Sequence, residues 1–132
     1  MKVRSIGFTK KVAILLALIV FGGVMPNAVA QSNYFVSSSS GDDKNNGLTV
    51  SNPWASMSRV SKEVLRPGDT VYFKSGDRFK GQLVIDESGT ALAPIHFSAY
   101  GKGDLPIIDG AAMSGGAPLA AVLIVDQDHL EL

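Results

Sequence analysis

Cysteine is absent from the 132 residues of this sequence. Its absence excludes disulfides, thiolate metal sites, a thiol nucleophile and a lipidated N-terminal cysteine. Clusters of basic residues are also lacking, because four of the 12 lysines and arginines lie within the first 30 residues, where no acidic residue occurs. The other 8 stand against 12 acidic residues, a net charge of −4. We therefore expect neither a nucleic-acid partner nor binding to an anionic membrane surface.

Long apolar runs are absent apart from one, residues 12–25. The basic residues that precede it are Lys2, Arg4, Lys10 and Lys11. The run has 14 residues, fewer than the ~20 that a helix needs to cross a bilayer core. With small side chains at Ala28 and Ala30, the pattern predicts a signal peptide over residues 1–30, cleaved after Ala30. We expect a secreted or periplasmic protein without membrane contact after cleavage; the alternative is an uncleaved anchor.

Short apolar runs dominate the rest of the chain and predict an all-β fold. A first strand is expected at residues 34–36. Six further runs follow, at residues 71–73, 83–85, 95–97, 107–108, 122–124 and 130–132. The first four of these begin 12 residues apart, so that two strands recur in about 24 residues, a period typical of stacked coils. Strands spaced 8 to 12 residues apart are also typical of a small antiparallel β-sandwich, which is the alternative.

One helix is predicted between the first strand and the later ones. Ser51 or Asn52 can cap it, Pro53 suits its first position, and residues 67–68, Pro-Gly, end it. The apolar residues that recur at spacings of 3, 3 and 4 are Trp54, Met57, Val60 and Val64. Such residues share one helix face, which must be buried against the strands.

Four segments, in order, carry a resemblance to a known architecture. They are YFVSSSSGDDKNNG at 34–47, NPWASM at 52–57, LRPGDTVYFKSGDRFKGQLVI at 65–85, and GTALAPIHFSAYGKGDLPIIDG at 89–110. Together they resemble the N-terminal part of secreted bacterial right-handed parallel β-helix proteins. These form the pectate-lyase-like superfamily, which includes many polysaccharide lyases and some glycoside hydrolases.

The resemblance implies a domain organisation. After the signal peptide, residues 31–68 would form a capping strand, loop and helix that close the N-terminal end of the β-helix. Such a lid would cover unpaired backbone groups and an apolar interior. Residues 69–132 would form the first coils, with turns at Gly76, Gly81, Gly101, Gly103 and Gly110. About two coils are present, so we expect an N-terminal part of a larger protein whose coils continue beyond residue 132.

The resemblance also implies a carbohydrate-active function. The full-length protein would act as a polysaccharide lyase or glycosidase on an acidic, uronate-containing polysaccharide, with Ca²⁺ as a cofactor in some of the family. None of the four segments carries a catalytic motif, so no catalytic, cofactor-binding or metal-binding residue is assigned, and this chain alone is expected to be inactive. The alternative is a noncatalytic β-helix module for glycan binding or adhesion.

Residues 42–47, DDKNNG, invite comparison with a calcium loop. Lys44 occupies a ligand position, however, and Pro53 stands where the closing glutamate should be, which excludes an EF-hand. A solvated turn is the simpler interpretation, and a looser calcium site is the alternative.

Two histidines and several cations also need an interpretation. His96 alternates with Ile95 and Phe97, which places it on the outside. His129, beside Asp126 and Asp128, is weak as a metal site. The expected coil-surface charges are Lys74, Arg78 and Lys80.

Overall fold

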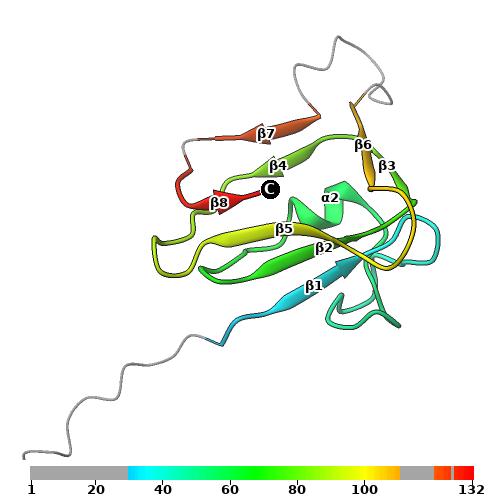
Figure 1. The fold of residues 1–132 in the computed structure, drawn as a ribbon, viewed down its shortest axis with the longest axis horizontal. Coiled ribbons are helices and arrows are strands. Elements are labelled where there is room, and N and C mark those ends of the chain that lie inside the picture. The colour runs from blue at the N-terminus through cyan, green and yellow to red at the C-terminus, as the bar shows by residue number, and fades with distance from the viewer. Residues whose placement is uncertain (1–29, 111–120, 126) are drawn as a thin grey trace, which may run out of the picture.

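The computed structural model describes residues 30–110, 121–125 and 127–132. Within these ranges the chain forms eight strands and one short helix, so the all-β prediction is confirmed (Figure 1). The predicted signal peptide lies outside the described residues, except for its last residue, Ala30. No helix among the described residues is long and apolar enough to cross a membrane.

The strands form three parallel sheets. One sheet has the order β1, β2, β5 and β8 (Asn33–Val36, Thr70–Lys74, Ile95–Tyr100 and Leu130–Glu131). The second pairs β3 with β6 (Arg78–Lys80 and Ile107–Asp109), and the third pairs β4 with β7 (Leu83–Ile85 and Val122–Ile124). All these strand pairings are parallel. The described strands therefore do not form the antiparallel pairs expected of the alternative fold, a β-sandwich.

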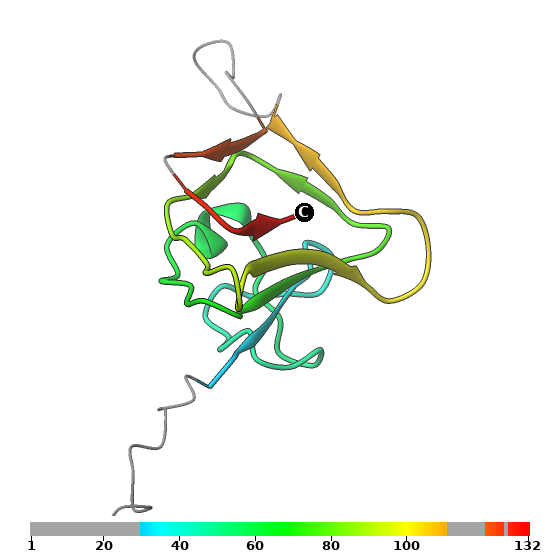
Figure 2. The ribbon, with the colours of Figure 1, turned by 60° about the vertical axis from the view of Figure 1, so that its left-hand side comes forward.

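The chain visits the three sheets in the same order twice, through β2, β3 and β4 and then through β5, β6 and β7, before β8 returns to the first sheet. Figure 2 shows the sheets arranged around a common interior. Each pass thus contains three strands, whereas the sequence predicted two. The missed strand is β3, in which a single buried residue, Phe79, stands between exposed Arg78 and Lys80. Its parallel pairing with β6, rather than an apolar run, makes it a strand.

Side chains that alternate toward the interior build the core. Val71 and Phe73 of β2 and Ile95 and Phe97 of β5 are buried, and the residues between them are more exposed. Phe73 also meets Phe79 edge to face, with 5.3 Å between ring centroids, and so links the first two sheets. The remaining buried apolar residues are Val36, Trp54, Met57, Val60, Leu65, Leu83 and Ile85.

The helix is shorter than predicted. α2 spans only Met57–Val60, and its N-cap is Ser56, whose hydroxyl accepts a hydrogen bond from the Arg59 N–H. The predicted start at Ser51 to Pro53 is wrong because the backbone of Trp54 pairs with β1 instead, through a parallel bridge to Val36.

The predicted apolar helix face is correct in part. Trp54, Met57 and Val60 are each buried, but Val64 is 73% exposed. The helix ends at Val60, so its periodicity does not continue to Val64, and Leu65 is buried instead. At the C-terminal end of α2, the Ser61 hydroxyl accepts a hydrogen bond of 2.9 Å from the Val84 N–H of β4. This contact joins the helix to the third sheet.

Four of the predicted turn glycines have left-handed backbones: Gly76, Gly81, Gly101 and Gly103 all have positive φ. Gly110 is not among the residues with positive φ. A Cβ built there would lie 3.1 Å from Ala121, so close packing favours glycine at this position.

Candidate functional site

The outward surface of the four-stranded sheet carries polar and aromatic groups that could meet a ligand. Three rows of side chains cross it, fixed by the strand register. The central row contains Phe35, Tyr72 and Ser98. A second row contains Thr70, His96 and Glu131, and a third contains Lys74 and Tyr100. We call this surface the outer face.

An aromatic cluster lies on the outer face. Phe35 and Tyr72 stack with 5.4 Å between ring centroids and 16° between ring planes. This follows from the register, because neighbouring strands lie about 4.8 Å apart, close to a ring-stacking distance. Tyr100 meets Phe35 edge to face at 5.3 Å. All three rings are partly exposed, so they lie at the surface and not in the core.

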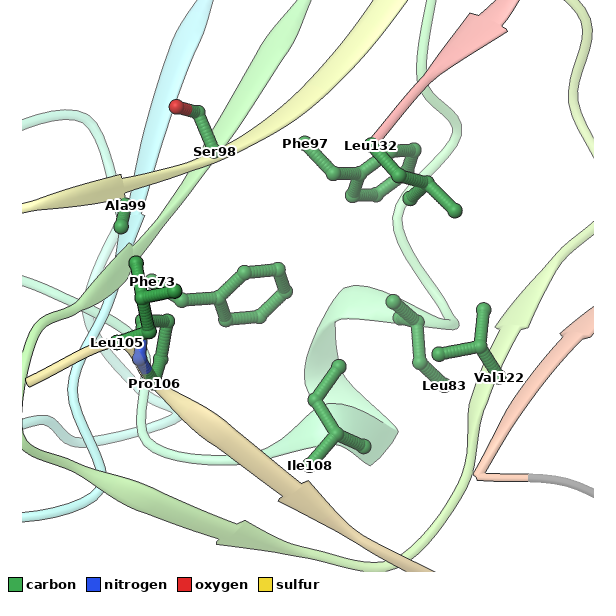
Figure 3. Close-up of a pocket in the computed structure, with 10 residues that line it drawn as sticks. All are labelled: Phe73, Leu83, Phe97, Ser98, Ala99, Leu105, Pro106, Ile108, Val122 and Leu132. Atoms are coloured by element: carbon green, nitrogen blue, oxygen red, sulfur yellow. The ribbon is translucent and has the colours of Figure 1, made fainter.

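The central row ends in a small side chain. Ser98 follows Tyr72 in the register and is exposed. Figure 3 shows its hydroxyl pointing away from the interior, whereas Phe97 beside it points inward. The ring of Tyr72 therefore stacks on Phe35 on its β1 side and faces a serine on its β5 side.

His96 and Glu131 form a pair in the second row. His96 Nδ1 and Glu131 Oε2 are 2.9 Å apart, and the side chains are 40% and 64% exposed. The predicted outward orientation of His96 is confirmed. Its partner could not be predicted, because 35 residues separate the two in sequence and only the pairing of β5 with β8 aligns them.

A buried carboxylate lies beyond the third row. Asp77 Oδ2 accepts hydrogen bonds from the Ser37 hydroxyl at 2.8 Å and from the Ser39 N–H at 3.2 Å. Burial acts to raise the pKa of Asp77, but these hydrogen bonds and the charge of Lys74 outweigh it and hold the pKa below its usual value. The ammonium group of Lys74 donates to the Ser39 hydroxyl at 3.1 Å.

Tyr100 keeps its proton at neutral pH. Burial and the nearby negative charge of Asp77 raise the pKa of its hydroxyl above the ordinary value. A tyrosine in this state can donate as well as accept a hydrogen bond.

In residues 42–47, the segment compared with a calcium loop, the carboxylates stabilise the fold through hydrogen bonds. Asp43 Oδ1 accepts hydrogen bonds from the N–H groups of Ala55 and Ser56 at 2.8 and 3.0 Å, and Oδ2 accepts one from the Ser56 hydroxyl at 2.6 Å. Burial acts to raise the pKa of Asp43, but the hydrogen bonds outweigh it and lower the pKa. Asp42 caps the turn by accepting from the Lys44 N–H. Both carboxylates thus bind backbone groups.

The structure does not bring the other histidine and the basic residues considered from the sequence together into a site. His129 uses its carbonyl oxygen to accept from the Ile95 N–H at 3.1 Å, and Asp126 lies outside the described residues. Arg78 pairs with Asp109 at 2.8 Å, and Lys80 is exposed. In the described ranges, no three histidine or carboxylate side chains converge as metal ligands would.

An apolar cavity of about 470 Å³ lies in the interior between the sheets. Figure 3 shows inward-pointing side chains from several strands around it, among them Phe73, Leu83, Phe97 and Val122. The complete lining is Phe73, Leu83, Phe97, Ser98, Ala99, Leu105, Pro106, Ile108, Val122 and Leu132. The Ser98 hydroxyl points away from the cavity, and the other lining side chains are apolar, so the cavity offers burial to apolar groups but no acid, base or nucleophile for a reaction.

The outer face as a unit was not predicted from the sequence. Alternation in residues 70–74 and 95–100 was a usable signal for Tyr72 and Ser98, since it turns them outward between buried neighbours. Which outward residues share a row depends on register, and the sequence does not state it.

The chain is similar to known carbohydrate-active enzymes. It is 39% identical over 90 residues to a lacto-N-biosidase of Bifidobacterium longum, a match covering 64% of this chain and 6% of that enzyme. No protein-family model matches the chain.

Solved structures give a consistent result. The crystal structure of the GH136 lacto-N-biosidase from Eubacterium ramulus resembles this fold with 32% sequence identity. Its native form has a TM-score of 0.66 and its selenomethionine derivative 0.65. Each match covers 75% of this chain and 19% of the crystallised one. The chain therefore spans a small part of the relatives it matches.

Proposed function

We propose that this chain forms coils of an extracytoplasmic carbohydrate-active protein of the right-handed parallel β-helix type. The observation that carries the proposal is the similarity to two lacto-N-biosidases, one in sequence and one in both sequence and structure. Three parallel sheets visited in turn provide further support, since each pass buries its inward side chains against the next.

The proposed reaction class of the whole protein is glycoside hydrolysis. The relatives are glycosidases by name, which favours the glycosidase over the polysaccharide lyase among the two activities that the resemblance implied. The outer face carries the Glu131 carboxylate as well as the Lys74 ammonium, so its charges do not favour a uronate. We therefore propose a neutral glycan as the substrate class.

The chain itself would supply structure and not the catalytic groups. Glycoside hydrolases generally use a pair of carboxyl groups about 5 to 10 Å apart, across the scissile bond. The described strands contain two carboxylates, Glu131 and Asp109, which lie on different sheets and are paired with His96 and Arg78. We expect the catalytic pair to come from further coils of the whole protein.

The N-terminal organisation belongs to the same proposal. Residues 1–30 would direct export and be removed, and residues 31–68 would cap the coils. Burial of Trp54, Met57 and Val60 beside the first sheet supports a capping role, as does the hydrogen bond between Ser61 and β4. Residues 69–132 would then form the coils.

A second candidate is a noncatalytic glycan-binding module. The partly exposed aromatic cluster of the outer face favours it, because flat rings with nearby polar groups suit sugar recognition without any catalytic pair.

The test applies the full chain to a glycan microarray of neutral oligosaccharides and oligogalacturonates, together with a hydrolysis assay on the neutral set. We expect binding to neutral glycans and no turnover. Binding to no glycan would overturn a carbohydrate function, and preference for oligogalacturonates would overturn the neutral substrate class. Hydrolysis by this chain alone would contradict the structural role proposed for it.

A further inference from the structure

We propose that the outer face binds a neutral pyranose stacked on Tyr72 and lying over Ser98. This inference rests on the proposed carbohydrate function and adds a location and a binding mode to it. The binding groups would be the ring of Tyr72, the Ser98 hydroxyl and the His96–Glu131 pair.

The stacking position follows from the central row. Phe35 and Tyr72 occupy two successive places in a ladder of rings, and Ser98 occupies the third. Strands in a sheet lie about 4.8 Å apart, so the third place has room for one further flat group in contact with Tyr72. Ser98 is exposed and its hydroxyl points outward, which leaves that place to a ligand (Figure 3).

Polar groups border this place along β5. His96 lies two residues before Ser98, so both side chains project from the same side of the strand. The ring of Tyr100 is turned toward Phe35 instead. Glu131 follows His96 in its row and is 64% exposed. The carboxylate accepts hydrogen bonds, and the serine hydroxyl both donates and accepts them. A sugar needs this mixture because each of its hydroxyls donates and accepts.

The chemistry of the patch favours a neutral sugar. A pyranose has apolar C–H faces and a polar rim, which matches an aromatic ring bordered by polar side chains. An acidic sugar would meet the carboxylate of Glu131. A purely apolar partner would remove water from the exposed His96–Glu131 pair and offer no hydrogen bonds in its place.

The test is to fill the proposed place. Ser98→Phe would extend the ladder of rings and occupy the site, while new stacking on Tyr72 should preserve or raise the melting temperature. The same substitution at exposed Ser58 on α2 is the matched control. Tyr72→Ala removes the stacking surface, and Tyr72→Phe retains it.

Binding of the full chain to lacto-N-biose, cellobiose, maltose and digalacturonate is measured by titration calorimetry. For the neutral disaccharide that binds best, we expect Ser98→Phe and Tyr72→Ala to weaken affinity by about tenfold or more. Ser58→Phe and Tyr72→Phe should stay within about twofold.

The outcomes separate this inference from the proposed function. If the unaltered chain binds a neutral sugar and Ser98→Phe binds it equally well, the site lies elsewhere and the carbohydrate function stands. If Ser98→Phe loses affinity while its melting temperature is kept, the site is supported. If the unaltered chain binds none of these sugars, the inference fails, and an empty microarray would show that the proposed function fails with it.

Discussion

At the scale of single residues, Trp54 shows how one side chain joins several parts of the fold. Its ring stacks on Tyr34 with 4.8 Å between ring centroids. The guanidinium group of Arg59, a residue of α2, lies 4.2 Å from the centroid of the Trp54 ring. Its indole N–H donates to the Asn45 carbonyl at 3.0 Å. With 1% of its surface exposed, Trp54 fixes the strand, loop and helix of the N-terminal region together.

We expect Trp54→Ala to lower the free energy of unfolding by about 3 to 5 kcal/mol, since it leaves a large cavity. Urea denaturation monitored by circular dichroism would measure this. Leu92→Ala is the control, because Leu92 is 98% exposed and its truncation should change little. A loss below about 1 kcal/mol at Trp54 would contradict its structural importance.

Both the backbone conformation and the lack of space favour glycine at position 47, whereas at Gly76 only the backbone conformation does. The φ of Gly47 is +73°, and a Cβ there would lie 2.4 Å from the Trp54 ring. Gly76 has a φ of +82° but open space around the position of a Cβ. Gly76→Ala should therefore cost only the left-handed backbone strain, about 1 to 2 kcal/mol.

Gly47→Ala should cost clearly more than Gly76→Ala, because the clash with Trp54 adds to the same strain. Thermal unfolding of the two variants would compare them. Equal destabilisation would mean that the loop moves aside without cost.

At the scale of elements, carboxylates hold loops to strands and to the helix. Asp43 joins residues 55–56 to the loop before them and thereby positions the N-cap of α2. Asp77 joins the end of β1 to the turn between β2 and β3. Hydrogen bonds to carboxylates suit a fold in which each strand is only two to six residues long, because they hold adjacent segments together where strand pairing is short.

We expect Asp43→Ala to destabilise the chain by about 1 to 3 kcal/mol, because three donors lose an ionised acceptor. Asp42→Ala is the matched control, since that carboxylate caps an exposed turn through the Lys44 N–H. Chemical denaturation would show the difference. If both variants were equally stable, Asp43 would not position the helix.

Asp77 predicts a dependence of stability on acid pH. Its folded pKa is lowered, so its contribution is present above the unfolded pKa and is lost as pH falls through the folded pKa. At neutral pH, Asp77→Asn should unfold more easily than the unaltered chain. The gap should shrink as pH is lowered below the usual range of a carboxyl group, as urea denaturation across pH would measure. A gap independent of pH would contradict this role of its charge.

At the scale of the whole molecule, β2 is the most extensively paired of the described strands. β2 lies between β1 and β5 and pairs with both along its length, whereas β8 aligns only two residues with β5. The apolar cavity adjoins β7, through Val122, and the end of the chain, through Leu132. Stability should therefore decrease from β2 toward β7 and β8.

Hydrogen exchange followed by NMR should show this gradient. We expect the amides of β2 to exchange more slowly than those of β7 and β8, because opening a central strand disrupts two pairings. Faster exchange in β2 than in β8 would contradict this order of stability.

The sequence by itself determined the strands that have apolar runs and the side chains that face inward. Alternation at residues 71–73 and 95–97 was sufficient to bury Val71 and Phe97 and to turn Tyr72 and His96 outward, because side chains of a strand alternate in any sheet. Turn glycines such as Gly76 were equally readable, since few other residues adopt positive φ.

Only the tertiary structure decided which strands pair, where the helix begins and which residues form the outer face. β3 has one buried residue and becomes a strand by pairing with β6, and Trp54 joins β1 when a helix was expected. The row of Phe35, Tyr72 and Ser98 joins three strands that lie far apart in sequence. Such contacts depend on register between distant segments, whereas local pattern records only the preferences of neighbouring residues.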